Sequence, residues 1–455
     1  PLSTMPRFSV LTVMPALLVV AVAFFVKYYP WEEHTDLRKM VDWNATWGTS
    51  EGRKESFRVA VDSADLDDLQ RRILSARIAP TRMAGDSEED AWAYGTDGEF
   101  LRDLQTRWAG KYLSKWTSEI EPALNEHPQY TAVVQGLRLH FQYAKTQKKG
   151  APTILLIHGW PSSVVEFSTL IPLLANDPTT PFNVIAVSLP GFGWSEAPSK
   201  KGFGLPQAAV LLVQFMRQMF PKTKYLIHGG DWGALIANAM AQLAPEDVKG
   251  IHVTWMIEML PMHRIIESLG VSVHGLVSAG SSQLLATARY LWEESGYIHI
   301  HATKPHSLGH ALTDSPIGLA AWLVEKYWGW TDNPAARQQR SSPFPLPLDP
   351  ILTNVMVYWI TGTAATSMRF FRETWDQPLI SAQAACGVVE DVPAAVAVFP
   401  QDPAAQKVWG NPVRGAKNKF RDLRQITTMS AGGHFPSIEQ PKLLHQDIVS
   451  FVSKL

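Results

Sequence analysis

The chain has 455 residues, which is enough for one large catalytic domain with appended segments. Its formal net charge is −1 at pH 7, so there is no electrostatic argument for a nucleic-acid partner or a strongly acidic partner. A single cysteine, Cys386, excludes an internal disulfide framework and is typical of a reducing compartment.

The first predicted element is an uncharged apolar run over residues 8–26, closed by Lys27. This run is long enough to span a bilayer as a helix, and aromatic residues typical of a membrane interface follow it. A cleaved signal peptide and a buried helix are the alternatives, but no small-residue cleavage site follows the run. We therefore predict a single-pass transmembrane anchor over residues 8–29. The positive charges just after it weakly favour a cytoplasmic main body.

Residues 30–130 are predicted to form a separate, mostly helical segment. Residues 62–78 place Leu66, Leu69 and Ile73 at helical spacing after a plausible N-cap, and residues 100–116 show a similar pattern. We expect helices with no site of their own.

A core with strands and glycine-rich turns is predicted from residue 131 onward. The apolar run 153–157 reads as a buried strand and leads directly into His158-Gly159-Trp160-Pro161. A His-Gly turn after the third strand of an α/β-hydrolase supplies a backbone N–H to an oxyanion hole. We expect this donor at Trp160, with the side chain of His158 structural. Another strand and a Gly/Pro-rich loop are predicted over 182–198.

An aspartate occupies the position of a nucleophile in the next segment. An apolar run over 225–227 leads into Gly229-Gly230-Asp231-Trp232-Gly233, and a helical stretch follows. Gly-x-nucleophile-x-Gly on a sharp strand-to-helix turn is the nucleophile elbow of α/β-hydrolases, where the glycines allow tight packing. A carboxylate is ionised at pH 7 and can attack without a base. The alternative is that Asp231 caps the following helix.

The rest of the chain is predicted to contain a helical lid and the end of the core. The lid is expected over 256–394, with a proline-rich loop at 341–350 rather than a helix. The core resumes over 395–455. A strand near 395–399 precedes Asp402, and a strand over 423–429 precedes His434 on a Gly-Gly loop.

The order of the candidates along the chain is nucleophile Asp231, acid Asp402 and base His434, which is the chain order of the α/β-hydrolase triad. If Asp402 were not the acid, Glu390, Asp391 or Asp376 could replace it. The sequence therefore predicts an α/β-hydrolase core over 131–255 and 395–455. It contains no spacing typical of a metal site or a phosphate-binding loop, so no metal or organic cofactor is expected.

Seven motifs show that the chain resembles the microsomal epoxide hydrolase family, which includes the juvenile hormone epoxide hydrolases of insects. They are HGWP (158–161), LPGFGWS (189–195), GGDWG (229–233), ESGYIHIHATKP (294–305), DSPIGLAAWLVEK (314–326), TNVMVYWITGT (353–363) and GGHF (432–435). The resemblance extends from about residue 30 to the end. It implies an epoxide-opening enzyme of the endoplasmic reticulum membrane, with an N-terminal segment that wraps around the catalytic domain.

The resemblance also assigns lid residues and reveals two departures. Tyr297 matches the lid tyrosine that hydrogen-bonds the epoxide oxygen. The family has a second tyrosine in an Arg-Phe-Tyr segment, but this chain has Phe371 there. Either Tyr297 acts alone, which we favour, or another tyrosine such as Tyr358 reaches the site. Relatives place Glu where this chain has Asp402, a change that preserves the charge and the expected role.

These residues predict the hydrolysis of an apolar epoxide by water through an ester on Asp231. Tyr297 would activate the epoxide, and His434, oriented by Asp402, would activate the water. Backbone N–H groups of Trp160 and Trp232 would stabilise the oxyanion. The alternatives are a haloalkane dehalogenase, which needs no acid for its leaving group, and a membrane-tethered binding protein without turnover. The oligomeric state is not predicted.

Overall fold

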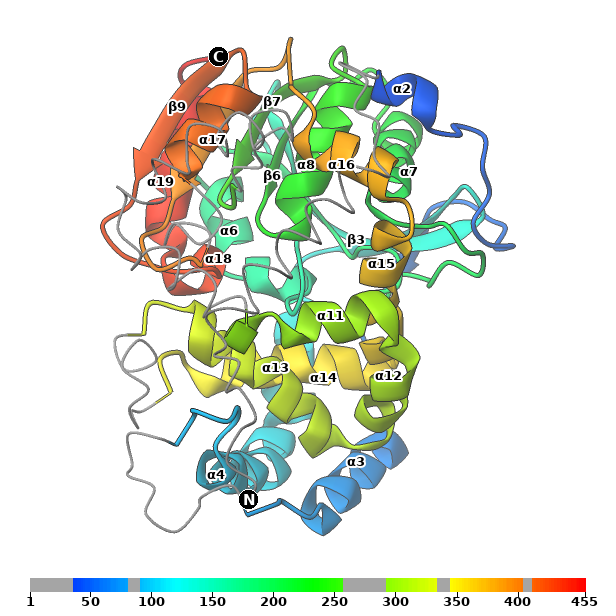
Figure 1. The fold of residues 1–455 in the computed structure, drawn as a ribbon, viewed down its shortest axis with the longest axis vertical. Helices are drawn as coiled ribbons and strands as arrows, with labels where there is room; N and C mark the ends of the chain where they lie inside the picture. Colours follow the sequence, from blue (N-terminus) through cyan, green and yellow to red (C-terminus); the bar gives the residue numbers. More distant parts are fainter. Residues whose placement is uncertain (1–35, 81–90, 257–291, 334–343, 404–410) are drawn as a thin grey trace, which may run out of the picture. The chain divides into compact units, whose positions relative to one another are not determined.

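The computed structural model describes residues 36–80, 91–256, 292–333, 344–403 and 411–455. The described residues from Leu37 onward belong to one structural unit, which contains the elements described below (Figure 1). The predicted membrane anchor over 8–29 lies outside the described residues. Across the part of the chain that is described, no helix has the length and apolarity needed to cross a membrane.

Nine strands of the described residues form one mixed sheet in the order β1-β2-β3-β5-β4-β6-β7-β8-β9. The pairs from β1 to β5 are antiparallel, and the pairs from β5 to β9 are parallel. The strands are β1 (Glu55–Phe57), β2 (Gln129–Val134), β3 (Leu137–Ala144), β4 (Thr153–Ile157), β5 (Asn183–Val187), β6 (Tyr225–Gly229), β7 (Val248–Val253), β8 (Ala394–Val398) and β9 (Leu423–Thr428).

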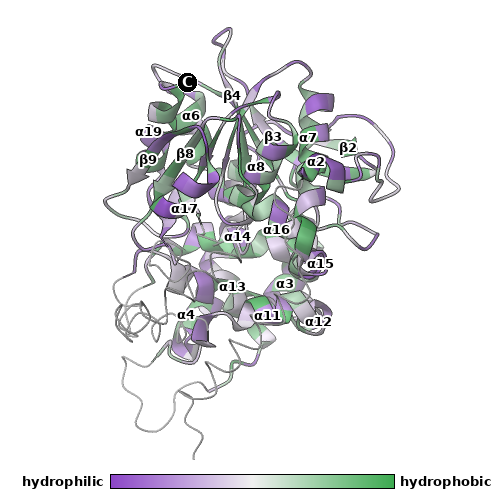
Figure 2. Ribbon diagram, turned by 45° about the horizontal axis from the view of Figure 1, so that its top comes forward, coloured by the Kyte–Doolittle hydropathy of each residue, from purple (hydrophilic) through white to green (hydrophobic). Residues whose placement is uncertain are grey.

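The inner parallel strands, from β4 to β8, are largely buried on both faces, which explains their mostly apolar sequences, whereas the edge strand β9 is half-buried. In β4, Leu155 and Ile157 belong to one apolar cluster of the core, while Ile154 and Leu156 belong to another. The strands are accordingly drawn as largely hydrophobic in Figure 2. The core helices and short turns are η5 (Val164–Phe167), α6 (Leu170–Ala175), α7 (Leu205–Met219), α8 (Trp232–Leu243), α17 (Pro412–Lys419), α18 (Pro436–Glu439) and α19 (Pro441–Val452).

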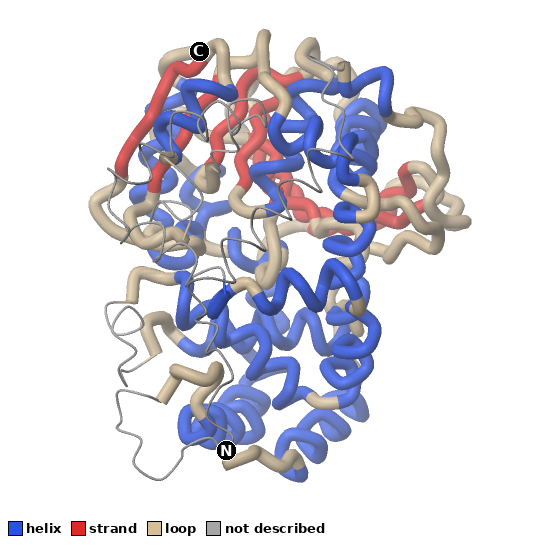
Figure 3. Tube along the Cα trace, in the orientation of Figure 1, coloured by secondary structure: helices blue, strands red, loops and turns tan. Residues whose placement is uncertain are grey.

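A group of helices follows β7 in the chain, as predicted for the lid. Figure 3 distinguishes the helices of the molecule, in blue, from the strands of the sheet, in red. The described lid helices are α11 (Gly296–Thr303), α12 (Pro305–Asp314), α13 (Pro316–Trp330), α14 (Leu348–Thr361), α15 (Ala364–Trp375) and α16 (Pro378–Cys386). The prediction of a loop throughout 341–350 was wrong at its end, because α14 already begins at Leu348. Pro350 fits there because the first turn of a helix needs no backbone N–H donor.

The N-terminal segment is helical, as expected, and it also supplies the edge strand β1. Its helices are α2 (Leu37–Met40), α3 (Ser63–Ser75), α4 (Gly98–Arg107), η2 (Trp108–Tyr112), η3 (Leu113–Lys115), η4 (Trp116–Ile120) and α5 (Glu121–Leu124). Helices α3 and α4 contact α13 of the lid. The predicted helix over 100–116 differs in detail, because two short π-helical turns follow α4.

Candidate active site

The turn between β6 and α8 brings Asp231 to the carboxyl edge of the sheet. Its backbone has φ 50° and ψ −127°, a conformation that non-glycine residues rarely adopt. Gly233 allows this tight turn, because a Cβ there would overlap the carbonyl of Ile157. Gly159 is also required, because a Cβ there would overlap the carboxylate of Asp231. The side chain of Asp231 makes no capping hydrogen bond to α8, so the capping alternative is wrong.

The Asp231 carboxylate lies between a backbone donor and a histidine. The backbone N–H of Trp160 donates to Oδ1 at 2.9 Å, and Nε2 of His434 lies 3.6 Å from Oδ2. Nδ1 of His434 lies 2.9 Å from Oδ2 of Asp402, which follows β8 and is 3% exposed. The structure therefore brings the three triad candidates together in the predicted order. Glu390 and Asp376 instead form ion pairs with Arg421 and Arg372.

The charge on the imidazole of His434 is controlled by its two carboxylate neighbours. Burial alone lowers the pKa of His434, but Asp402 and Asp231 together outweigh it and raise the pKa to about 10. The ring is therefore protonated at neutral pH in the free enzyme.

A half-buried glutamate that was not predicted from the sequence holds the loop of His434. The Oε2 atom of Glu439 accepts the backbone N–H groups of Asp332 and Gly433, and its Oε1 atom accepts that of Phe435. The backbone N–H of His434 itself donates to the carbonyl of Trp330 at 2.8 Å. The catalytic loop is thus attached to the end of lid helix α13. The only sequence signal was an acidic residue in the short helix after GGHF.

Helix α14 of the lid holds the HGWP turn on the opposite side of Asp231. The Asn354 amide donates to the carbonyl of Pro161 at 2.7 Å, and the Tyr358 hydroxyl donates to the carbonyl of Ser162 at 2.8 Å. Tyr358 is buried and committed to this contact, as expected for a residue that packs in the lid. His158 is fully buried, and its Nε2 accepts the backbone N–H of Leu189, which agrees with a structural role.

The second predicted oxyanion donor, Trp232, is the first residue of α8. In the described residues, no hydrogen bond joins its backbone N–H to the Asp231 carboxylate, so only Trp160 donates in this state. The indole of Trp232 instead packs edge-to-face against Phe371, with ring centroids 4.8 Å apart.

Aromatic side chains from the lid surround the Trp160 turn. The ring of Tyr297 stacks on Trp160 at a centroid distance of 5.1 Å, and Phe371 lies 6.2 Å from Tyr297. His301, also not predicted, packs between Trp160 and Phe371, 4.8 Å from each ring. Burial lowers the pKa of His301 to about 3, so this ring is neutral. The second tyrosine position of the family is therefore occupied by an apolar ring inside the aromatic cluster.

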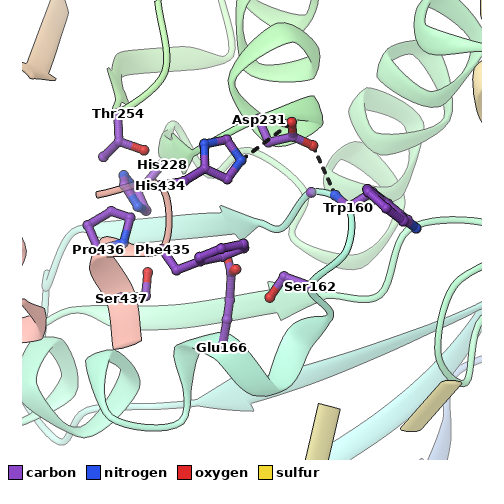
Figure 4. A pocket seen from close by; sticks show the side chains of 12 residues that line it. Trp160, Ser162, Glu166, His228, Asp231, Thr254, His434, Phe435, Pro436 and Ser437 are labelled. Atoms are coloured by element: carbon purple, nitrogen blue, oxygen red, sulfur yellow. Dashed lines mark hydrogen bonds and ion pairs between the residues drawn. The ribbon is translucent and has the colours of Figure 1, made fainter. Parts of the chain in front are cut away.

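A cavity of about 20 Å³ lies beside the carboxylate of Asp231 (Figure 4). Its lining residues are Gly159, Trp160, Ser162, Glu166, His228, Gly230, Asp231, Thr254, His434, Phe435, Pro436 and Ser437. Burial raises the pKa of Glu166 to about 7, which leaves it close to half ionised at neutral pH. Among the described residues, no group of three or more His, Cys, Asp or Glu side chains could hold a metal ion.

Comparisons with known proteins agree with this geometry. Residues 54–167 match the family described as "Epoxide hydrolase N terminus", and residues 152–279 match "alpha/beta hydrolase fold". The chain is 35% identical to epoxide hydrolase 1 of Sus scrofa, over 88% of each chain. It is 36% identical to juvenile hormone epoxide hydrolase 1 of Ctenocephalides felis, over 90% of this chain and 88% of that protein.

Solved structures show the same likeness. Juvenile hormone epoxide hydrolase from the silkworm Bombyx mori has a TM-score of 0.79 at 29% identity, covering 91% of this chain and 98% of that chain. Aspergillus niger epoxide hydrolase has a TM-score of 0.71 at 27% identity, covering 90% of this chain and 99% of that chain. With these relatives, the α/β-hydrolase fold and a candidate triad in the expected order, the chain belongs to the epoxide hydrolase family and is an enzyme that hydrolyses epoxides.

Proposed function

We propose that this epoxide hydrolase opens its substrate through a covalent ester on Asp231. One carboxylate oxygen attacks an oxirane carbon, the carbon–oxygen bond of the ring breaks, and the released alkoxide takes a proton from Tyr297. Water then attacks the carbonyl carbon of the Asp231 ester. The observation that supports this proposal best is the carboxylate of Asp231 placed between the Trp160 N–H and the His434 imidazole.

We propose that alkylation itself converts His434 into a base. The ester carries no charge, so His434 loses one of the two carboxylates that raise its pKa in the free enzyme. The ring can then lose its proton, which restores the Tyr297 hydroxyl that was deprotonated in the first step, and it can accept a proton from water while Asp402 keeps its orientation. Proton acceptance by His434 becomes favourable only after the nucleophile has reacted, which gives the two half-reactions a fixed order.

We infer that Tyr297 is the principal donor to the epoxide oxygen. This role is supported by its stacking on Trp160 and by the commitment of the Tyr358 hydroxyl to the carbonyl of Ser162. The aromatic side chains around it favour apolar epoxides over polar ones. Relatives are named for juvenile hormone, so terpenoid epoxides belong among the first substrates to be assayed.

We also propose that residues 8–29 anchor the enzyme in the endoplasmic reticulum membrane, with the catalytic domain facing the cytoplasm. The support is the uncharged run over residues 8–26, which has the length of a bilayer-spanning helix. Apolar epoxides partition into membranes, so an anchor would bring the enzyme to its substrate.

A single turnover in oxygen-18 water, with the enzyme in excess, tests the ester mechanism. The first diol should contain mostly unlabelled oxygen, because its new oxygen comes from the Asp231 carboxylate. A diol that carries the label from the first turnover would show direct attack of water on the epoxide and would end the proposal.

A further inference from the structure

A buried chain of hydrogen bonds runs from the active-site cavity to helix α19. His228 on β6 lines the cavity, and its Nδ1 lies 3.0 Å from Nδ1 of His252 on the neighbouring strand β7. Nε2 of His252 lies 2.9 Å from Oδ2 of Asp447. The two histidines are each 1% exposed and Asp447 is 7% exposed. The proposed two-step mechanism gives none of these three residues a role.

The chain determines which nitrogen of His228 carries a proton. Burial raises the pKa of Asp447, but hydrogen bonds from His252, Thr427 and Gln425 lower it below its ordinary value, so the carboxylate only accepts. With Nε2 donating to Asp447, the Nδ1 atom of His252 faces Nδ1 of His228 and offers it a lone pair. His228 must then donate from its own Nδ1.

As a result, Nε2 of His228 is left as a hydrogen-bond acceptor. Burial lowers the pKa of His228 well below its ordinary value, so the ring stays neutral and this lone pair persists. No described residue donates a hydrogen bond to Nε2. One nitrogen of this buried histidine is hydrogen-bonded to protein, whereas the other lies at the wall of a polar cavity and has no protein donor. Such an acceptor indicates a small hydrogen-bond donor inside the cavity.

The cavity has the size and lining of a site for one water molecule. Its volume of about 20 Å³ exceeds the roughly 10–15 Å³ that one water requires, and a water needs 2–4 polar partners. In Figure 4, Asp231, His434 and His228 lie in one row across the cavity, with Glu166 and Ser162 on the other side. The Oγ atom of Ser162 is buried with no hydrogen-bond partner among the described residues. A water here therefore reaches both the nucleophile and the proposed base.

We propose that this cavity holds the water that hydrolyses the Asp231 ester, and that Nε2 of His228 positions it by accepting a hydrogen bond. This inference rests on the proposed ester mechanism. One proton of the water passes to His434, and the water oxygen bonds to Cγ of Asp231. The second proton stays on that oxygen and is directed to His228. The ester oxygen of the substrate then leaves with the proton from His434. His252 and Asp447 are positioning residues, because they act only by fixing the tautomer of His228.

The test measures the two half-reactions separately by rapid quench and intact-mass analysis of the protein after mixing with styrene oxide. His228→Leu should leave the alkylation rate within about twofold and slow ester hydrolysis by roughly tenfold to a hundredfold, the typical effect of a misplaced reactant. The alkyl-enzyme should therefore accumulate. His228→Gln should restore most of the hydrolysis rate, because an amide can donate to His252 and still present an oxygen to the cavity.

Variants of Asp447 test the tautomer argument at a distance from the water. Asp447→Leu removes the acceptor of His252, so the chain can reverse and present an N–H of His228 to the cavity; hydrolysis should slow while alkylation persists. Asp447→Asn keeps an acceptor oxygen and should retain most of the hydrolysis rate.

A matched control is His140→Leu, which removes another fully buried, doubly hydrogen-bonded histidine of the sheet. It should lower thermal stability without changing the ratio of the two rates.

Several outcomes would overturn the inference without affecting the ester mechanism. The first is an adduct on His228→Leu that is hydrolysed at the wild-type rate. The second is an equal loss of the hydrolysis rate in the Leu and Gln variants, and the third is a parallel decrease in the rates of alkylation and hydrolysis. Slow hydrolysis in Glu166→Gln combined with normal hydrolysis in His228→Leu would assign the water to the carboxylate instead. Absence of any adduct in the wild-type enzyme and in all of these variants, His434→Gln included, would contradict the proposed function itself.

Discussion

The backbone of Asp231 is strained, and the strain directs its side chain. A non-glycine residue in such a sparsely populated region costs on the order of 1–3 kcal/mol and persists only where its surroundings hold it. Here the carboxylate points away from the helix that it precedes and accepts the N–H of Trp160. A helix cap would have no need of this conformation, whereas a nucleophile gains access to a substrate.

His434→Gln should separate the half-reactions. Ionised Asp231 needs no base, so alkylation should continue, whereas water attack loses its proton acceptor and should slow by about 10²-fold or more. Intact-mass analysis after mixing with epoxide should show an adduct that persists for many wild-type turnover times. A variant that neither turns over nor forms an adduct would show that His434 is required for the first step or for folding.

Tyr297→Phe should nearly abolish alkylation, with a loss of roughly 10²–10³-fold, because one preorganised donor is removed and Phe371 cannot replace it. Phe371→Tyr should fold and should alkylate at least as fast as the wild type, since its ring already lies 6.2 Å from the Tyr297 ring. Stopped-flow alkylation rates check both variants. If Tyr297→Phe keeps most of the rate, the donor is another group, and His301 would be the first to examine.

At this scale the sequence predicted the residues that carry motifs and missed those that depend on packing. Asp231, Asp402 and His434 could be found because each follows a strand that ends at the same sheet edge. Glu439 and His228 could not, because their importance comes from partners on other elements. The His252–Asp447 contact, for example, joins residues 195 positions apart. No local pattern encodes such a pairing.

At the scale of elements, the end of lid helix α13 and the loop of His434 form one hydrogen-bonded unit through Glu439. Its carboxylate accepts three backbone N–H groups from the two segments. Burial raises the pKa of Glu439 to about 7, so placing this carboxylate here costs desolvation energy, which the three donors and the charge of His434 partly offset. Movement of this end of the lid must therefore also move His434.

Glu439→Ala should lower stability by about 1–3 kcal/mol, the usual penalty for buried donors left unsatisfied, and should slow ester hydrolysis more than alkylation. Thermal unfolding and single-turnover kinetics measure the two effects. Glu373→Ala is a suitable control, because that carboxylate accepts the single backbone N–H of Gly202 and lies outside the candidate site. It should destabilise the protein without changing the ratio of the half-reactions. Equal slowing of both steps in Glu439→Ala would argue against a specific effect on His434.

Elements were predictable where the chain has a strong local pattern. The strand predicted over 153–157 was confirmed residue for residue, because a short apolar run between turns has few alternatives once it is buried on both faces. The proline-rich segment before α14 was harder, since a proline in the first helical turn resembles one in a loop. Tertiary contacts decide where such a helix begins.

At the scale of the whole molecule, the N-terminal segment is bonded to the lid. Arg72 contacts Asp314, and Arg107 forms a 2.6 Å ion pair with Asp349. The Tyr112 hydroxyl lies 2.9 Å from that of Thr353. Individual surface ion pairs contribute little to the free energy of unfolding. The fully buried side chains of Trp108, Tyr112 and Trp116, however, belong to the same apolar core as the lid helices. Through these contacts the segment supports the lid.

Deletion of residues 1–29 should release the enzyme from membranes and leave its activity within about twofold, since the only uncharged run long enough to span a bilayer would be removed. Fractionation after high-salt and carbonate washes, together with a diol assay, measures both properties. The full-length chain is the control and should remain in the pellet. A truncated protein that also remains in the pellet would show that another surface of the protein binds the membrane.

The small volume of the cavity beside Asp231 has a consequence for the choice of acceptor. A space of about 20 Å³ matches water-sized molecules, so methanol, which carries an additional methyl group, fits it less well. If methanol reached the ester, it would release the diol but leave a methyl ester on Asp231, which would remove the nucleophile until that ester was hydrolysed. A cavity that favours water over larger acceptors would therefore limit self-inactivation in the presence of small alcohols. Turnover in dilute methanol should leave an unmodified protein mass, and a gain of one methyl group would show that the cavity opens during catalysis.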